Sequence, residues 1–257
     1  MTEPIFLSPY RDVEMDKASI SARKSFKILW RELSWEIRRV IPGIDLSAVK
    51  KAFPTNQNQK SNFSVEYMWV GDITFDGQLI TGQLLNQPND IENLNQGETV
   101  KFHYEEILDW MYISGEVYGA FTVNVLRSRM TKTELREHDD AWGIDYGDPK
   151  KVQVQIEPML SFNKFLVTPS IELPEHQMSQ NMAKKSEEGI KEMGGQINDP
   201  FIFGMTMLQF ESLAGNLAQV KLLIKYGADK KIKNMNGQTA QDLAEMFNWS
   251  KISAVLK

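Results

Sequence analysis

Cysteine is absent from this sequence, only three of its 257 residues are histidine, and no long run of apolar residues occurs. The lack of cysteine excludes disulfide bridges, thiol catalysis and cysteine-bound zinc, and it is typical of proteins in a reducing compartment. No stretch approaches the roughly 20 apolar residues that a membrane helix needs. The segment from Met1 to Tyr10 lacks the basic start and apolar core of a signal peptide. These absences predict a cytoplasmic protein without a membrane partner.

Motifs for catalysis or phosphate binding are missing as well. The sequence contains no G-x-S-x-G, no S-x-x-K with its partner elements, and no glycine-rich phosphate loop. The net charge of -5 disfavours nucleic-acid binding, which needs a concentrated basic face. We therefore expect no enzyme activity, no cofactor, no metal and no nucleic-acid partner.

An acidic cluster around one histidine is the strongest candidate for a catalytic or metal site. Its members are Glu134, Glu137, His138, Asp139, Asp140, Asp145 and Asp148. Glu134 and His138 are four residues apart and would share one side of a helix, but a further ligand at a defined spacing is missing. A solvated acidic helix end is therefore the favoured interpretation.

A hydrolase-like enzyme built on Asp109, His138 and Asp145 is the alternative that stays open. Asp109 could be a buried carboxylate with a raised pKa, although a side chain that caps a turn is the simpler interpretation. The remaining histidines, His103 and His176, are expected to be surface or hydrogen-bonded residues.

Hydrophobic periodicity divides the first part of the chain into a helix followed by strands. Residues 16–40 have the apolar spacing of an amphipathic helix, and residues 46–53 predict a second, short helix. From residue 65 the pattern alternates with period two, and Asp76-Gly77 is typical of a hairpin turn. The expected strands cover residues 65–70, 79–85, 99–103, 107–113, 117–123, 152–156 and 162–167. This order predicts an α+β domain with an N-terminal helix and a mostly antiparallel sheet.

The polar segment that begins at Pro174 separates two parts of the chain. It runs to Glu188 and is rich in polar residues, as links between domains are. We therefore predict an α+β domain over residues 1–173, followed by a linker and a helical domain over residues 174–257.

The last third of the sequence repeats with a step of 33 residues. The matched pairs are Gly194 and Gly227, Gly204 and Gly237, and Thr206 and Thr239. A fixed period of this size is typical of stacked units, each of which buries one face against its neighbour. The two threonine hydroxyls are placed to cap the first helix of a unit, and Gly227 to end the second helix in a left-handed conformation.

These residues resemble the ankyrin repeat. The matching stretches are Gly204-Met-Thr-Met-Leu-Gln, Leu213-Ala-Gly-Asn and Val220-Lys-Leu-Leu-Ile-Lys-Tyr-Gly-Ala-Asp. Met207 and Gln209 depart from the pattern, since they replace the usual proline and histidine. The resemblance covers residues 186–257 and implies a short all-α stack that binds another protein and catalyses nothing.

The ankyrin resemblance also implies where a partner would bind. In repeat proteins the loops between units and the first helices form the recognition face. The corresponding residues here are Gln209, Ser212, Lys230, Lys231, Lys233, Asn234, Asn236 and Gln238. The lysines stand out on an acidic protein, so a partner with an acidic surface is expected.

Separated aromatic and glycine motifs in the first part resemble the YegJ-like family, a bacterial domain family of unknown function. They include Ala48-Val-Lys-Lys-Ala-Phe, Glu66-Tyr-Met-Trp-Val, Asp109-Trp-Met-Tyr, Gly119-Ala-Phe-Thr and Trp142-Gly-Ile-Asp-Tyr-Gly-Asp-Pro. The resemblance spans about residues 22–149. Because the family has no established activity, the resemblance implies a folding unit and no particular chemistry.

The predicted function is the binding of another protein. Its most concrete form is a cytoplasmic bacterial immunity or antagonist protein that binds a cognate toxin, because small ankyrin proteins and associated orphan domains occur in such systems. A regulatory ankyrin adaptor without a toxin partner, and the hydrolase-like enzyme described above, are the alternatives.

Residues 174–257 are expected not to fold cooperatively when expressed alone. Only one repeat is complete, whereas roughly three units are needed for a stable stack. A stack this short buries too little apolar area to offset its conformational entropy. Thermal melts followed by circular dichroism should be broad for the fragment and sharp for the full chain. A sharp, cooperative melt of the fragment would contradict the prediction.

Overall fold

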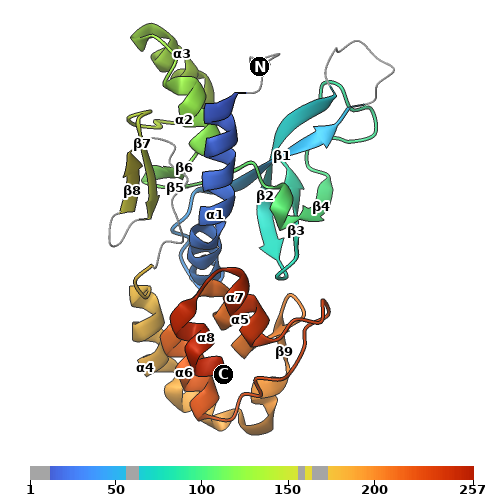
Figure 1. Cartoon of the computed structure of the whole chain (residues 1–257), viewed down its shortest axis with the longest axis vertical. Coiled ribbons are helices and arrows are strands. Elements are labelled where there is room, and N and C mark those ends of the chain that lie inside the picture. Colours follow the sequence, from blue (N-terminus) through green and yellow to red (C-terminus); the bar gives the residue numbers. More distant parts are fainter. Residues whose placement is uncertain (1–11, 56–63, 156–159, 164–172) are drawn as a thin grey trace.

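A six-stranded sheet crossed by one long helix forms the N-terminal part of the protein, and a group of shorter helices lies below it in Figure 1. The computed structural model describes residues 12–55, 64–155, 160–163 and 173–257. All neighbouring strands of the six-stranded sheet are antiparallel. The expected combination of helices with a mostly antiparallel sheet is confirmed.

The six strands follow the order β4-β3-β2-β1-β5-β6. They are β1 (Leu46–Pro54), β2 (Val65–Phe75), β3 (Leu79–Leu84), β4 (Thr99–His103), β5 (Asp109–Ser114) and β6 (Glu116–Gly119). β2 and β3 form the expected hairpin. Asp76 stabilises its turn, because the Oδ1 atom accepts hydrogen bonds from the backbone N–H groups of Gln78 (2.9 Å) and Leu79 (2.8 Å). A short 3-10 helix, η1 (Tyr104–Glu106), leads from β4 towards β5.

The prediction of a short helix over residues 46–53 is wrong. This segment is β1, which pairs with β2 on one side and with β5 on the other. Alanine and lysine are good helix formers, so the local sequence favours a helix. Hydrogen bonds to two flanking strands and the burial of Val49 and Phe53 in the core override this local preference.

Helix α1 (Val13–Glu36) packs across the sheet. Trp110 of β5 donates a hydrogen bond from its Nε1 to the carbonyl oxygen of Ala22 (2.8 Å), which joins the sheet to the helix. The helix ends before the expected position at residue 40. Its last side chain, Glu36, accepts a hydrogen bond from the backbone N–H of Gly43 (2.8 Å) and so stabilises the turn that leads to β1.

The expected strand over residues 117–123 is correct only in its first half. β6 ends at Gly119, and helix α2 (Phe121–Arg127) begins two residues later. Gly119 (φ +81°) and Ala120 (φ +56°) have left-handed backbone conformations that reverse the chain direction. A Cβ atom at position 119 would lie 2.2 Å from the carbonyl oxygen of Trp110, so glycine is required there.

Aromatic side chains pack on both faces of the sheet. Trp110 belongs to the main core on the α1 side, whereas Trp69 belongs to a smaller cluster. Their partners on β1 are Val49 and Lys50, which are consecutive and therefore point to opposite faces. The smaller cluster includes Tyr146, in the segment that follows α3 (Lys132–Trp142).

Two further strands, β7 (Lys151–Gln155) and β8 (Leu160–Asn163), form a separate antiparallel pair. They confirm the strands expected over residues 152–156 and 162–167 as far as the structure describes them. Residues 156 and 164–167 of those two predictions lie outside the described residues.

The C-terminal part consists mainly of helices. Its elements are α4 (Gln177–Glu192), η2 (Gly194–Asn198), β9 (Pro200–Ile202), β10 (Met205–Thr206), α5 (Met207–Ala214), α6 (Leu217–Lys225), α7 (Ala240–Met246) and α8 (Ser250–Leu256). Most of the polar segment expected as a linker is helix α4. This helix contacts α6, and the hydroxyl of Tyr226, which follows α6, donates a hydrogen bond to Glu187 on α4 (2.9 Å). The domain boundary at residue 174 stays a prediction.

The step of 33 residues reappears in the helix caps. Thr206 caps α5 and Thr239 caps α7, each by accepting a hydrogen bond from the backbone N–H three residues later. In both caps the side chain at that position, Gln209 or Asp242, reaches back to the backbone N–H of the threonine. The two caps that the sequence predicts are therefore confirmed.

Gly227 ends α6 with a left-handed backbone (φ +92°), as the sequence predicts. Gly227→Ala should destabilise the protein by about 1 kcal/mol, because residues with a Cβ atom are strained in this conformation. Gly189→Ala is the matched control. Gly189 lies within α4 with open space around its Cβ position, so this change should stabilise by about 0.5–1 kcal/mol. Urea denaturation measures both effects, and equal shifts of the two variants would contradict the prediction.

Candidate protein-binding surface

The loop between α6 and α7, residues 230–238, carries most of the predicted binding residues and is here called the finger loop. Lys231 and Lys233 are exposed to solvent. Lys230 is only half-exposed, and its Nζ donates a hydrogen bond to the carbonyl oxygen of Val255 at the end of α8 (2.9 Å). Two of the three predicted lysines are thus free to face a partner, and the third attaches the loop to α8.

Three amide side chains of the finger loop contact the β2–β3 turn. Asn234 and Asn236 each donate to the carbonyl oxygen of Asp76 (3.3 Å), and Gln238 donates to that of Gly77 (3.3 Å). The turn lies close against α7 as well, since a Cβ atom at position 77 would be 2.5 Å from a methyl group of Leu243. These three predicted binding residues therefore hold the chain's own hairpin turn.

The two predicted binding residues on α5 are buried. Gln209 is 2% exposed, and its Nε2 donates hydrogen bonds to the carbonyl oxygens of Ile232 (2.9 Å) and Gln238 (3.1 Å). It thereby fixes the start and the end of the finger loop. Ser212 is fully buried. Neither side chain offers a surface to a partner, although the sequence pattern places both on a recognition helix.

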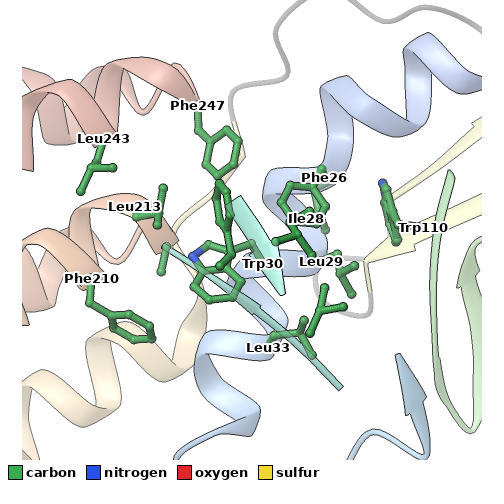
Figure 2. Packing of buried hydrophobic residues seen from close by; sticks show 14 of the residues in the cluster. Phe26, Ile28, Leu29, Trp30, Leu33, Trp110, Phe210, Leu213, Leu243 and Phe247 are labelled. Carbon is green, nitrogen blue, oxygen red and sulfur yellow. The ribbon is translucent and has the colours of Figure 1, made fainter. Parts of the chain in front are cut away.

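Helix α1 packs against the C-terminal helices. Figure 2 shows Phe26 and Trp30 of α1 in one apolar cluster with Phe210 and Leu213 of α5 and with Phe247, the residue after α7. The ring centroids of Trp30 and Phe210 are 6.0 Å apart, and those of Phe26 and Phe247 are 6.2 Å apart. Helix α1 thus covers apolar side chains of α5 and the end of α7, whereas the predicted recognition residues Gln209, Asn234, Asn236 and Gln238 are held by the finger loop and the β2–β3 turn.

Charged side chains from α1 are buried in the same contact. Lys27 is 5% exposed, its Nζ donates to the carbonyl oxygen of Phe247 (3.1 Å), and it lies 4.6 Å from the ring centre of Trp249. Burial, together with the neighbouring charge of Arg31, lowers the pKa of Lys27 to about 8. Near the end of α1, Arg38 pairs with the buried carboxylate of Glu211 at 2.6 Å.

A cavity of about 210 Å³ opens where the finger loop meets the sheet. Lys101 of β4 and the highly exposed Met235 belong to its lining. The sequence did not predict a role for either residue. The pattern around Lys101 indicates an ordinary strand lysine, and nothing in the sequence places β4 beside the finger loop. Pairing of β4 with β3 and the docking of the β2–β3 turn bring them together.

Asp109, the first residue of the hydrolase alternative, is fully buried and holds the start of α2. Its Oδ1 accepts hydrogen bonds from the backbone N–H groups of Trp110 (2.8 Å) and Phe121 (2.9 Å), and its Oδ2 accepts from that of Thr122 (2.7 Å). Burial raises the pKa of this carboxyl, while hydrogen bonds from Thr122 and the charge of Lys50 act in the opposite direction. The side chain is therefore both a buried carboxylate and a helix cap.

The other two residues of the alternative have different surroundings. Nδ1 of His138 lies 2.8 Å from Oδ1 of Asp139. The same carboxylate accepts hydrogen bonds from the buried guanidinium of Arg127. Asp145 is exposed, and its Oδ1 accepts a hydrogen bond from the backbone N–H of Gly147 (2.9 Å). Of the three residues of the hydrolase alternative, Asp109 is thus fully buried and Asp145 faces solvent. Each of the three contacts groups close to it in the structure.

The remaining histidines are hydrogen-bonded, as expected. Nδ1 of His103 accepts from the backbone N–H of Glu105 (3.3 Å), and Nδ1 of His176 accepts from that of Met178 (3.1 Å).

Across the described ranges, no three side chains of histidine, aspartate or glutamate gather closely enough to hold a metal ion. None of the helices in those ranges is both long and apolar enough to cross a membrane. The absence of enzyme activity stays a prediction.

The fold and surface define a protein with a helix-and-sheet domain and a C-terminal group of paired helices that presents a basic loop. Residues 12–146 match the family described as "Uncharacterized protein conserved in bacteria (DUF2314)". The chain belongs to this family, in agreement with the YegJ-like resemblance.

Two relatives extend the comparison. The chain is 35% identical over 254 residues to a Neisseria meningitidis serogroup B protein named "Putative ankyrin repeat protein NMB1133/NMB1171". This match spans 98% of the present chain and 96% of the relative. The match to "Uncharacterized protein YegJ" of Escherichia coli K12 is 33% identical over 73 residues, or 28% of this chain and 48% of that protein. The similarity to the first relative thus includes the C-terminal helices.

Lys27 makes the stability of the fold depend on pH. Its pKa in the folded protein, about 8, lies below the value of about 10.4 in an unfolded chain. The unfolded state therefore binds more protons between these values, and the wild type gains stability as pH rises through this window. From pH 7 to 9.5 the stability difference between wild type and Lys27→Met should grow in favour of wild type by about 1–2 kcal/mol.

Lys24→Met, on the exposed side of the same helix, is the control and should show no such change. Guanidinium denaturation at each pH measures the difference. A pH-independent gap between wild type and Lys27→Met would show that Lys27 does not carry this dependence.

Proposed function

We propose that this chain is a cytoplasmic protein-binding protein whose C-terminal helices form a short ankyrin-type stack. The observation that supports this most directly is the pair of matching helix caps at Thr206 and Thr239, separated by the same step of 33 residues as the sequence repeat. Similarity across almost the whole chain to a relative named as an ankyrin repeat protein agrees with it. Repeats of this kind bind proteins through surfaces formed by successive units.

The proposed contact surface is the exposed part of the finger loop, in particular Lys231 and Lys233. Their ammonium groups would meet an acidic partner surface and would mainly raise the rate of association. The buried faces of Gln209 and Ser212 are excluded from the proposed contact, since they are already packed inside the chain. The proposed function is therefore binding, without catalysis at Asp109 or His138.

The narrower form of the proposal is a bacterial immunity or antagonist protein that binds a toxin. The bacterial family and the ankyrin-named relative support a partner-binding role in bacteria, and the toxin is the proposed partner. A regulatory adaptor would share the same surface and differ only in the partner. An isolated partner that is lethal when produced alone, and harmless when produced with this chain, would favour the immunity role over the adaptor.

Charge reversal of the finger loop tests the proposed surface. The full-length chain is used to purify its partner from the native cells, and association is then measured by surface plasmon resonance at several salt concentrations. The double variant Lys231→Glu with Lys233→Glu should associate at least tenfold more slowly at low salt and show a weaker salt dependence.

Lys184→Glu with Lys185→Glu, on exposed positions of α4, is the matched control and should keep the wild-type rate. Equal association rates for the finger-loop variant and wild type would move the recognition surface elsewhere. Failure of the full-length chain to enrich any specific partner would contradict the proposed function itself.

A further inference from the structure

The cavity of about 210 Å³ is formed by four segments that are far apart in the sequence. The β2–β3 turn contributes Asp76 and Leu79, β4 contributes Lys101, the β9–β10 turn contributes Phe203, and the finger loop contributes Met235. The cavity therefore exists only because the sheet and the C-terminal helices are docked. Residues 76, 79, 101, 203, 234, 235 and 236 are here called the seam cavity.

Two apolar side chains form one wall of the seam cavity. Phe203 has a left-handed backbone (φ +52°), which is unfavourable for a bulky residue and is found where function or packing requires it. Its ring packs near Trp30, with centroids 6.2 Å apart, so the strained turn holds it in a defined position. Met235 is 92% exposed, and its sulfur lies 3.2 Å from the Cβ position of Gly204 in the same turn. A flexible thioether thus lies beside a fixed aromatic ring at the opening.

Positive charge is found in the lining and on the finger loop. Lys101 lines the cavity, and Lys231 and Lys233 are exposed on the finger loop. Within the residues that the structure describes, none of these three ammonium groups forms an ion pair. Hydrogen bonds from Thr239, with a smaller contribution from Lys233, lower the pKa of Asp242, so Lys233 has this carboxylate in its surroundings.

The one acidic side chain in the lining is already engaged. Oδ1 of Asp76 accepts hydrogen bonds from the backbone N–H groups of Gln78 and Leu79 and from Nδ2 of Asn236 (3.1 Å). The negative charge of Asp76 is therefore stabilised by hydrogen-bond donors of the chain itself. The seam cavity thus combines apolar side chains, Leu79, Phe203 and Met235, with the cationic side chain of Lys101.

We propose that the seam cavity receives one apolar side chain from an acidic segment of the partner protein, whose carboxylates pair with Lys101, Lys231 and Lys233. This inference rests on the proposed protein-binding function and specifies the partner's surface chemistry. The volume is below the roughly 300–1,000 Å³ of pockets that bind drug-sized ligands, which favours a single side chain over a free small molecule. Anchoring of a side chain in such a pocket is typical of the residues that dominate protein interfaces.

A second cavity, of about 190 Å³, lies between η2 and α5 and provides a comparison. Its lining includes Met193, Ile197 and Phe201, so it is also apolar. Its one charged lining residue is Asp199, which would repel an acidic segment. Charge complementarity therefore selects the seam cavity for an acidic partner.

Methionine methyl groups allow the site to be tested on the full-length chain. The protein is labelled with ¹³C at the methionine methyl carbons, and the Met235 signal is identified through Met235→Leu. The first probe is a synthetic twelve-residue peptide of glutamates with a central leucine. In the second probe alanine replaces the leucine, and in the third lysines replace the glutamates.

The acidic peptide with leucine should shift the Met235 signal and leave Met193 unchanged. Replacing leucine by alanine should weaken binding about tenfold, which is the expected effect of losing one buried apolar side chain. Lys101→Glu should weaken binding of the same peptide at least threefold, whereas the exposed control Lys24→Glu should not. These results would support the proposal.

Three outcomes would overturn it. They are a shift of Met193 in place of Met235, equal binding of the acidic and basic peptides, and equal binding of the leucine and alanine peptides. Measuring the purified native partner with Lys101→Glu separates this inference from the proposed function. Unchanged partner binding by that variant would leave the protein-binding function in place and would remove the seam cavity from it.

Discussion

The packing of α1 between the sheet and the C-terminal helices is the contact on which the other features of the molecule depend. Trp30 lies 5.4 Å from Phe75 of the sheet and 6.0 Å from Phe210 of α5, measured between ring centroids. Phe26 makes the corresponding contacts with Phe75 and Phe247. One apolar cluster therefore extends from the sheet through α1 into the helical part. The C-terminal helices thus share their apolar core with α1 and the sheet.

Contacts between the C-terminal helices and the rest of the chain determine which surfaces remain available to a partner. Gln209 and Ser212 of α5 are buried, and the amides of Asn234, Asn236 and Gln238 hold the turn at Asp76 and Gly77. Lysines of the finger loop and of β4 remain exposed on a protein whose net charge is -5. The charge that a partner would meet here thus differs in sign from that of the whole molecule, which favours an acidic contact surface.

Sequence reasoning succeeded where the determining interactions are local. The caps at Thr206 and Thr239, the hairpin turn at Asp76 and the left-handed end of α6 at Gly227 all depend on residues a few positions away. It failed for β1, because the local preference of residues 46–53 for a helix is overridden by hydrogen bonds to two other strands. The expected linker likewise became α4 through its contact with α6.

The sequence by itself determined the element types in most segments, the helix caps and the repeat of 33 residues, since these follow from side chains that act over one or two turns of chain. Only the tertiary structure decided that Gln209 and Ser212 are buried, that Asp109 caps α2, and that Lys101 and Met235 line one cavity. Each of these results requires segments far apart in the sequence to meet. Their meeting depends on how the apolar faces of α1, the sheet and the C-terminal helices fit together, and that fit has no periodic signature in the sequence.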